Sequence, residues 1–285
     1  MPTFHSLVGT FNTPELFTLA FNTNDGHPLN LHVMHRAPAV GSHSWLHLSN
    51  CKKLLYATAW SDPPTLVAYA VKTPTEINQI NSVPTASRSG YVTASSTAVY
   101  SAGGASGEVF ALDPLTGGFA IPLKDETTYE PLQKLNFVED VPQQDDGTVM
   151  DFGGLRHGAH SYWADEVRTS RSNGVEPHYL YTSTRGLVAS TKGYVAAFSL
   201  TEDGLIRGWK GGDQDGLLAL WETPTSGGWA NAIQPGPTID GTEYIAMTDS
   251  EEGLIMILSW DGQGFREAAR TKLDPGTGAA TAVWL

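Results

Sequence analysis

The sequence has little cysteine, little positive charge and no long apolar run, and each shortage excludes a class of protein. Its 285 residues include one cysteine, Cys51, so an internal disulfide is excluded. No Asn-x-Ser/Thr acceptor occurs either, and both absences favour a cytoplasmic protein. The apolar stretches are far shorter than the ~20 residues of a transmembrane helix. Residues 1–5 have no signal-peptide character and are expected to begin a strand.

Positive charge is scarce and scattered. Lys and Arg number 17 against 30 Asp and Glu, which gives a net charge of −13. No basic stripe is present, so nucleic acid is not expected as a partner. A small organic anion remains a suitable substrate, because a few convergent arginines reverse the local field inside a pocket. The sequence carries no signal for an oligomeric state or for binding to a membrane.

What the sequence does contain is a hairpin pattern that recurs five times. An apolar pair, often ending in Tyr, is followed by small residues, and after a turn comes a second alternating apolar run. The copies begin at Leu7, Leu55, Val99, Leu180 and Ile245. Such repetition predicts an all-β chain folded as one β-propeller domain over residues 1–285, with five four-stranded blades or alternatively six. In a propeller the chemistry is expected in the central channel.

Each repeat is interpreted as one blade. The innermost strands are expected at residues 44–48, 90–93, 159–165 and 230–234. The first repeat has no such strand, but residues 281–284 at the C-terminus resemble one. We therefore expect the C-terminal strand to complete the first blade, which joins the two ends of the chain.

A long acidic segment, at about residues 124–154, separates the third and fourth repeats. It is rich in turn residues and shows no blade pattern. Three interpretations stay open: a surface loop, a lid over the channel mouth, and a degenerate sixth blade.

Six stretches of the chain follow a pattern known from one enzyme family. They are residues 223–232, 245–253, 1–10, 44–45, 72–77 and 282–284. Together they resemble the 3-carboxy-cis,cis-muconate lactonising enzymes, also called carboxy-cis,cis-muconate cyclases. The likeness covers roughly residues 1–115 and 178–285, with blade-length segments in the same order.

The resemblance implies descent from a seven-bladed propeller that needs no metal or organic cofactor. Its members close a carboxylated muconate into a lactone by adding a carboxylate across a double bond. This chain is about two blades shorter in the middle. There the family carries most of its catalytic set, a His before Gly, an Arg in His-Pro-Arg-Trp and a Glu. The Arg and Glu strings have no counterpart here. Arg185 matches a family Arg that follows the second strand of a later blade, and His157-Gly158 repeats the His-Gly in another context.

The densest candidate cluster lies where a loop is expected to meet the fourth innermost strand. Arg156 could hold a carboxylate with two hydrogen bonds, and His157 or His160 could move a proton. Alternatively, the histidines only satisfy loop carbonyls. A zinc site is not predicted, because residues i and i+3 of a strand point to opposite faces and no third ligand accompanies them.

Arginines and tryptophans near the other strand ends complete the candidate site. Arg185 is predicted to clamp a carboxylate or an oxyanion, and a salt bridge between blades is the alternative. Trp45, Trp163 and Trp229 lie on or beside innermost strands, as does Trp284; they either fill the core or form an apolar wall for a planar ligand. Asn231 either donates to a ligand carbonyl or holds a turn.

The sequence thus predicts a cofactor-independent cyclase, an intramolecular lyase, isomerase or cycloaddition enzyme, acting on a small conjugated substrate. Three residues are expected to be catalytic: His157, Arg185 and Arg156. Six are expected to bind the substrate: His160, Trp163, Trp45, Trp229, Asn231 and Arg88. No metal site is predicted. The alternatives are a hetero-Diels–Alder pericyclase of secondary metabolism, an orthodox muconate lactonase and a non-catalytic binding propeller.

Overall fold

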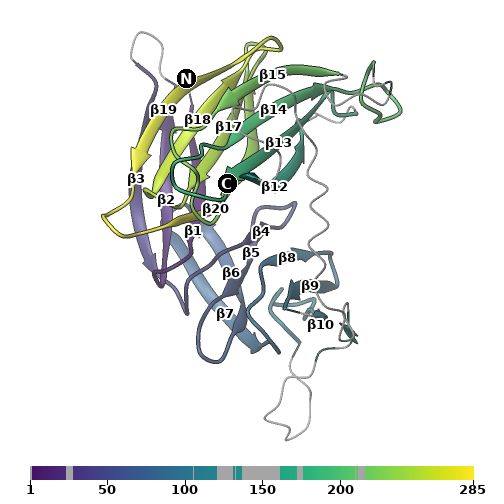
Figure 1. The fold of residues 1–285 in the computed structure, drawn as a ribbon. Coiled ribbons are helices and arrows are strands. Elements are labelled where there is room, and N and C mark those ends of the chain that lie inside the picture. Colours follow the sequence, from purple (N-terminus) through teal and green to yellow (C-terminus); the bar gives the residue numbers. More distant parts are fainter. Residues whose placement is uncertain are drawn as a thin grey trace, which may run out of the picture. The chain divides into compact units, whose positions relative to one another are not determined.

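The computed structural model describes residues 2–23, 28–104, 106–120, 131, 133–136, 161–171, 176–208, 210 and 216–285. These residues form 20 strands that pair into five four-stranded sheets (Figure 1). This confirms the predicted all-β fold of five four-stranded propeller blades. No sixth sheet forms in the described ranges. The same ranges contain no helix that is both long enough and apolar enough to cross a membrane.

Each sheet except the first consists of strands consecutive in the chain. The first sheet contains β1 (Thr3–Thr10), β2 (Glu15–Asn22), β3 (Asn30–Pro38) and β20 (Ala279–Trp284). The second contains β4 (Leu46–Leu48), β5 (Leu54–Ala59), β6 (Thr65–Thr73) and β7 (Glu76–Pro84). The third contains β8 (Tyr91–Ala94), β9 (Ala98–Gly103), β10 (Ser106–Ala111) and β11 (Gln133–Asn136). The fourth contains β12 (Tyr162–Thr169), β13 (Tyr179–Gly186), β14 (Tyr194–Ser199) and β15 (Leu217–Glu222). The fifth contains β16 (Ile233–Ile239), β17 (Thr242–Asp249), β18 (Leu254–Trp260) and β19 (Phe265–Lys272).

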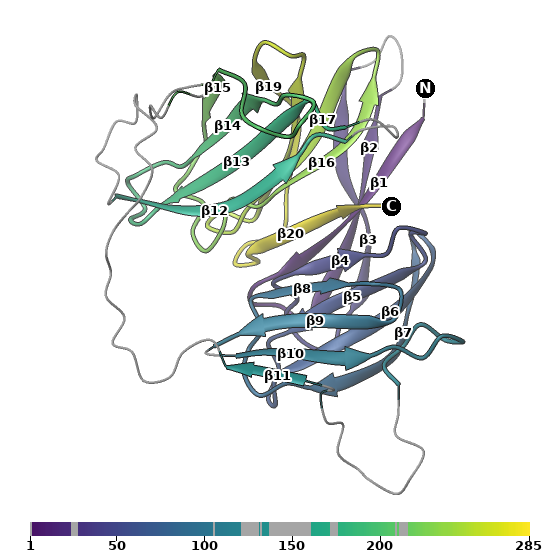
Figure 2. The ribbon, with the colours of Figure 1, turned by 90° about the vertical axis from the view of Figure 1, so that its right-hand side faces the viewer.

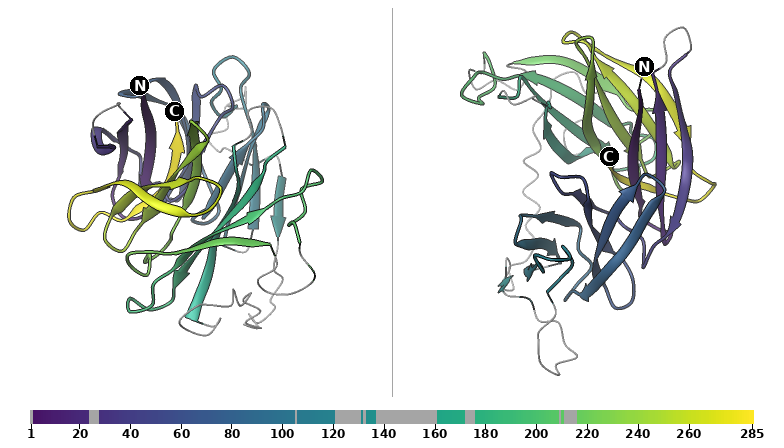
Figure 3. Two further views of the ribbon diagram at one scale, coloured as in Figure 1. Left: turned by 90° about the horizontal axis from the view of Figure 1, so that it is seen from above. Right: turned by 180° about the vertical axis from the view of Figure 1, so that it is seen from behind.

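The first sheet joins the two ends of the chain. Its order is β20-β1-β2-β3, so the C-terminal strand pairs with the N-terminal one, as the sequence predicts (Figure 3). Every residue of β20 is buried, and the amide of Leu285 donates a hydrogen bond of 2.9 Å to the carbonyl of His5. The C-terminus is therefore a structural strand and not a free tail.

The third sheet corrects one sequence-based expectation. Residues 133–136 lie inside the segment 124–154, for which no blade pattern is predicted, yet they form β11, the fourth strand beside β10 (Figure 2). The stretch Gln-Lys-Leu-Asn has a single apolar residue, so its period-two signal is too weak to identify a strand. All but one of the other residues of 124–154 lie outside the described ranges, so the loop and lid hypotheses stay predictions.

The innermost strands of the fourth and fifth sheets also differ from their predicted bounds. The fourth is predicted to end at Asp165, but β12 continues to Thr169. An ion pair between Arg168 and the buried Glu166 allows these charged side chains to lie within the strand. The fifth is predicted to begin at residue 230, but β16 begins at Ile233.

The described residues divide into two compact units. Unit 1 contains the fourth and fifth sheets, unit 2 contains the second and third, and the first sheet has residues in both. Each unit has its own apolar core, formed where alternating side chains of neighbouring strands meet. Trp260 and Tyr181 are central in unit 1, and Tyr56 and Leu55 are central in unit 2. That residues 1–285 form one domain stays a prediction.

Candidate functional site

The site that the structure supports best lies in unit 1, at one end of the antiparallel pair β12 and β13. Trp163 and Arg185 face each other across this pair. The register shifts between Ala164 and Glu166, so Asp165 has no partner on β13 and forms a β-bulge. A bulge changes the direction of a side chain and is common beside binding sites. Here it places the Asp165 carboxylate beside Arg185.

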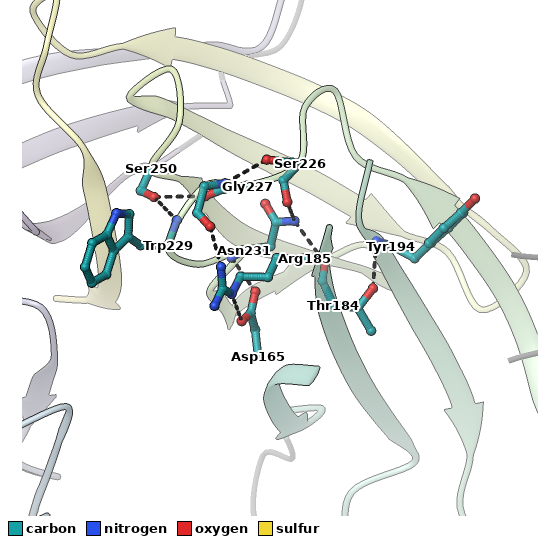
Figure 4. A network of polar contacts seen from close by, with 10 residues as sticks. Asp165, Thr184, Arg185, Tyr194, Ser226, Gly227, Trp229, Asn231 and Ser250 are labelled. Atoms are coloured by element: carbon teal, nitrogen blue, oxygen red, sulfur yellow. Dashed lines mark hydrogen bonds and ion pairs between the residues drawn. The ribbon is translucent and has the colours of Figure 1, made fainter. Parts of the chain in front are cut away.

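The guanidinium of Arg185 has three partners, which define the Arg185 cluster with it. Nη1 donates a hydrogen bond of 2.7 Å to the carbonyl of Gly228, and Nε lies 3.4 Å from Oδ1 of Asp165 (Figure 4). Cζ lies 5.7 Å from the ring centroid of Trp163, within the range of a cation–π contact. The side chain is 26% exposed, and Nη2 makes no hydrogen bond within the described ranges. Within the described ranges, one edge of the guanidinium therefore has no protein hydrogen-bond partner.

Asp165 is the buried counter-ion of this arginine. Its side chain is 8% exposed, and its Oδ2 accepts a hydrogen bond of 2.8 Å from the backbone N–H of Asn231. Burial raises the pKa of Asp165 to about 7, and the neighbouring charge of Glu166 also raises it. The Asn231 hydrogen bond and the Arg185 charge act in the opposite direction. The carboxyl group therefore titrates near neutral pH.

A glycine turn supplies the carbonyl that holds Arg185. Gly227 and Gly228 have φ values of +92° and +64°, which only glycine adopts readily. A Cβ atom on Gly228 would also lie 2.8 Å from the backbone nitrogen of Glu251. The hydroxyl of Ser250 fixes the turn, because it accepts from the N–H of Trp229 at 2.6 Å and donates to the carbonyl of Gly227 at 2.9 Å (Figure 4).

Two tryptophans of unit 1, Trp163 and Trp229, are unusually exposed. Trp163 is 57% exposed and Trp229 is 68% exposed, although a large apolar side chain is normally buried. The ring of Trp163 contacts Arg185, whereas Trp229 directly follows the Gly228 carbonyl in the chain. The cation thus lies against one exposed aromatic ring, that of Trp163.

Asn231 is fully buried, and its amide holds backbone. Nδ2 donates to the carbonyl of Thr184 at 2.9 Å and to that of Ser226 at 3.4 Å (Figure 4). Its Oδ1 has no hydrogen-bond partner in the described part of the chain. This geometry favours the turn-holding interpretation of Asn231 over direct contact with a ligand.

The other predicted site residues lie elsewhere. Arg156, His157 and His160 lie outside the described residues, so their roles stay predictions. Trp45 and Arg88 belong to unit 2, where Trp45 packs on the apolar cluster and on Tyr91, with ring centroids 4.8 Å apart. Arg88 is exposed on the segment before β8, and Trp284 is buried in β20.

Asp165 and the Gly228 carbonyl were missed by the sequence-based prediction. One signal could have identified the acid: Asp165 and Glu166 are adjacent acids in an otherwise apolar strand pattern, flanked by Trp163 and Val167. Two neighbouring strand residues normally point to opposite faces, so at least one of them had to be buried. The pair Gly227-Gly228 indicates a turn, but the sequence does not show that the Gly228 carbonyl accepts from Arg185, because that contact joins residues 43 positions apart.

Unit 2 contains a separate groove of about 520 Å³. It lies among the turns that follow β4, β8 and β10, and its lining includes His47, Cys51, Lys53 and Tyr56. None of the predicted site residues lines it. Cys51 is a free, exposed thiol in a turn, as the sequence indicates. Within the described ranges, no group of three or more His, Cys, Asp or Glu residues is placed to hold a metal ion.

The fold is that of a β-propeller, and three known proteins are similar to this chain. The chain is 27% identical to muconate cycloisomerase 1 of Cutaneotrichosporon cutaneum over 385 residues, which cover 98% of this chain and 97% of that protein. It is 36% identical to the carboxy-cis,cis-muconate cyclase of Neurospora crassa over 107 residues, 37% of this chain and 26% of that protein. No protein-family model matches the chain.

A solved structure from Bacteroides uniformis, described as a candidate 6-phosphogluconolactonase, has a TM-score of 0.63. It is 14% identical, and the match covers 100% of both chains, so this likeness supports the fold alone. The alignment with muconate cycloisomerase 1 spans 385 positions and this chain has 285 residues, so at least 385 − 285 = 100 positions have no counterpart here. This chain is therefore markedly shorter than that relative.

Proposed function

We propose that this protein is a cofactor-independent cyclase acting on a small conjugated carboxylic acid, with the Arg185 cluster as its anion site. The observation that carries the proposal is the partly exposed guanidinium of Arg185, which has a free edge and lies against an exposed tryptophan ring. An arginine fork matches the two oxygens of a carboxylate, and an aromatic face suits a planar conjugated chain.

The chemistry requires positioning and charge stabilisation. In a ring closure, a carboxylate oxygen of the substrate adds to one carbon of a double bond, and the other carbon becomes electron-rich and takes up a proton. Arg185 would stabilise the negative charge that develops on a conjugated second carboxylate. Trp163 and Trp229 would hold the chain in a folded conformation close to the attack geometry. His157 or His160 is proposed as the proton donor, with Arg156 as a second cation.

The names of the relatives support a cyclising activity, since two of them are a muconate cycloisomerase and a carboxy-cis,cis-muconate cyclase. The 100 or more unmatched positions favour an altered reaction over the orthodox lactonisation. A hetero-Diels–Alder closure in secondary metabolism is the second candidate, because a pericyclic step needs fewer acid–base groups. A cytoplasmic location belongs to the same proposal.

Turnover by the wild-type protein tests the proposal. The protein is incubated with cis,cis-muconate, its 3-carboxy derivative and conjugated polyenes, and products of unchanged mass are sought by chromatography and mass spectrometry. Loss of the diene absorbance follows the rate. We expect Arg185→Met to reduce kcat/KM for the true substrate by at least 100-fold, which corresponds to about 3 kcal/mol of transition-state stabilisation.

A matched control is Arg266→Met, which removes a largely exposed arginine of the same unit. It should leave turnover unchanged, and circular dichroism should show that both variants fold. Full turnover by Arg185→Met would show that the Arg185 cluster is not the anion site of the enzyme. If a conjugated acid binds in an Arg185-dependent manner but is never converted, the protein is a binding propeller.

A further inference from the structure

Asp165 holds Arg185 loosely. The distance of 3.4 Å between Oδ1 and Nε is longer than the ~2.7–2.9 Å of a charge-assisted hydrogen bond. The stronger anchor is the Gly228 carbonyl, at 2.7 Å from Nη1. The guanidinium can therefore exchange its carboxylate partner while its neutral anchor remains in place.

The surroundings of Asp165 make its ionised form costly. The charged groups that face it in the described ranges are Arg185 from β13 and Glu166 from its own strand. Glu166 is itself paired with Arg168 and accepts the N–H of Ile233 at 2.6 Å. From the segment before β16, Asp165 receives the neutral N–H of Asn231. One cation thus compensates a buried carboxylate that lies beside a second carboxylate.

A ligand carboxylate bound to Arg185 changes the balance of positive and negative charge at the site. Bound beside an ionised Asp165, it would put two anions on one guanidinium in a poorly hydrated place, which is unfavourable. Uptake of one proton by Asp165 restores the balance, since the site then holds one cation and one anion, as it does without ligand. No covalent bond other than the O–H bond is made, and the proton comes from solvent.

We propose that Asp165 is the positioning residue of Arg185. When a carboxylate ligand binds to the guanidinium, Asp165 loses its ion pair with Arg185 and takes up a proton. The inference rests on the proposed function, in that the ligand is an anion held by Arg185. It assigns to Asp165 a coupling between proton uptake and ligand binding. The Asp165 carboxyl stays protonated while the ligand occupies the guanidinium.

The coupling has a definite pH dependence. Below the pKa of Asp165, about 7, the carboxyl is already protonated in the free protein, so affinity is independent of pH. Above it, each binding event must take a proton from solvent, and Kd rises toward tenfold per pH unit. The ligand carboxylates stay ionised throughout this range, with ordinary pKa values near 4.

Isothermal titration calorimetry with cis,cis-muconate, and with acetate as the minimal carboxylate, measures both quantities. Titrations at pH 6, 7, 8 and 8.5 in two buffers of different ionisation enthalpy give Kd and the number of protons taken up. We expect the wild-type protein to take up nearly one proton at pH 8 and almost none at pH 6. Asp165→Asn should bind with a pH-independent Kd and no proton uptake. The control Glu252→Gln, an exposed acid paired with Lys272, should behave as the wild type.

The outcomes separate the inference from the function on which it rests. If Asp165→Asn still takes up the proton, another group is responsible and the inference fails. If wild-type binding involves no proton between pH 6 and 8.5, it fails whether or not the variant folds. If Arg185→Met binds as tightly as the wild type, or if neither carboxylate binds to the wild type, the proposed function falls and the inference falls with it.

Discussion

The second and third sheets meet mostly through neutral groups, with one buried acid, Glu108 of β10, which accepts the backbone N–H of Ala86 at 3.0 Å. The fourth and fifth sheets meet through three buried acids. We call the contact between the second and third sheets the neutral junction. There Tyr56 Oη donates a hydrogen bond of 2.8 Å to the Gly117 carbonyl, and Trp60 Nε1 donates one of 2.8 Å to the Ser89 carbonyl. An apolar cluster that includes Val92 and Phe110 lies beneath them. The neutral junction therefore relies mainly on apolar burial and uncharged hydrogen bonds.

The carboxylate junction links the fourth and fifth sheets through acids from both. Asp165 and Glu166 of β12 accept the backbone N–H groups of Asn231 and Ile233. In the reverse direction, Glu243 of β17 accepts the hydroxyl of Tyr181 at 2.6 Å. Burial is the main cause that raises the pKa values of all three acids.

The same blade pattern is thus joined in two ways, and the partly exposed Arg185 lies at the junction with more buried acids. Buried carboxylates are costly to a fold, so three at one junction against one, Glu108, at the other indicate a use beyond stability. The experiments below test this difference between the two junctions. The first of them measures how much stability is lost when a structural strand outside both junctions is removed.

Removal of residues 281–285 should have the largest effect. These residues include most of β20, which is buried throughout and pairs with β1. The loss of so many buried contacts is comparable with the whole stability of a typical domain, about 5–15 kcal/mol. We expect no cooperative thermal transition by circular dichroism, whereas Trp284→Phe should retain one. A shortened chain that melts like the full one would contradict the role of β20.

At the carboxylate junction, Glu166→Ala should cost about 3–5 kcal/mol, because it leaves the half-buried Arg168 cation and the Ile233 N–H without their buried acceptor. Urea denaturation measures the loss. The exposed acid Glu252, paired with Lys272, provides the control, and Glu252→Ala should leave the midpoint unchanged. Equal midpoints for both variants would mean that the carboxylates do not join these sheets.

The two regions should respond to pH in opposite directions. The raised pKa values of Asp165 and Glu166, about 7 in the folded state, favour the protonated forms, so the stability of unit 1 falls as pH rises from about 4 to 7. In unit 2, burial lowers the pKa of His43 to about 4, and its ring is held by the Thr58 carbonyl and the Tyr69 hydroxyl. The neutral form is favoured there, so stability falls as pH drops from about 6.5 to 4.

Hydrogen exchange of peptides from each unit, measured by mass spectrometry at several pH values, gives the two opening free energies after correction for intrinsic exchange. Each should change by several kcal/mol across its own range, and the change should be larger in unit 1, where two acids contribute, than in unit 2, where one histidine does. Asp165→Asn should make the profile of β12 shallower, since Glu166 still titrates, and leave that of β5 as it was. Parallel profiles in the two units would remove the distinction between the junctions.

The smallest effect is expected at the neutral junction. Tyr56→Phe keeps the buried ring and loses only the hydrogen bond to the Gly117 carbonyl, which costs about 1 kcal/mol. Because burial raises the pKa of Tyr56 to about 12, the cost should be constant from pH 5 to 9. Urea titrations at both limits check this, with Tyr100→Phe as an exposed control. A pH-dependent cost would show that this junction is not neutral.

Much of the fold could be predicted because its signal is local. The apolar pairs at Leu55 and Leu180 and the run at Leu254 correspond to β5, β13 and β18. The closing strand was predicted from the similarity of residues 281–284 to the other innermost strands. β11 could not be predicted, because four largely polar residues become a strand only when the edge of β10 accepts them.

The candidate site was predictable only in part. Arg185 was identified by its match to a family position, and Trp163 and Trp229 by their places beside innermost strands. Their partners were not, because Asp165 reaches Arg185 through a bulge, and a bulge depends on the register between two strands. Asn231 donates its backbone N–H to Asp165, and its side-chain amide faces backbone carbonyls, so its predicted contact with a ligand stays a prediction.

The sequence by itself determined the class of fold, the four-strand repeat and the presence of an arginine among tryptophans, because alternation, turn residues and repeat spacing are properties of the chain. Only the tertiary structure decided which carboxyl lies beside that arginine and how firmly it is held. The reason is physical: the burial of Asp165, the register of its strand and the contact of the glycine turn with Arg185 depend on residues 20 to 66 positions apart, and no single segment carries them.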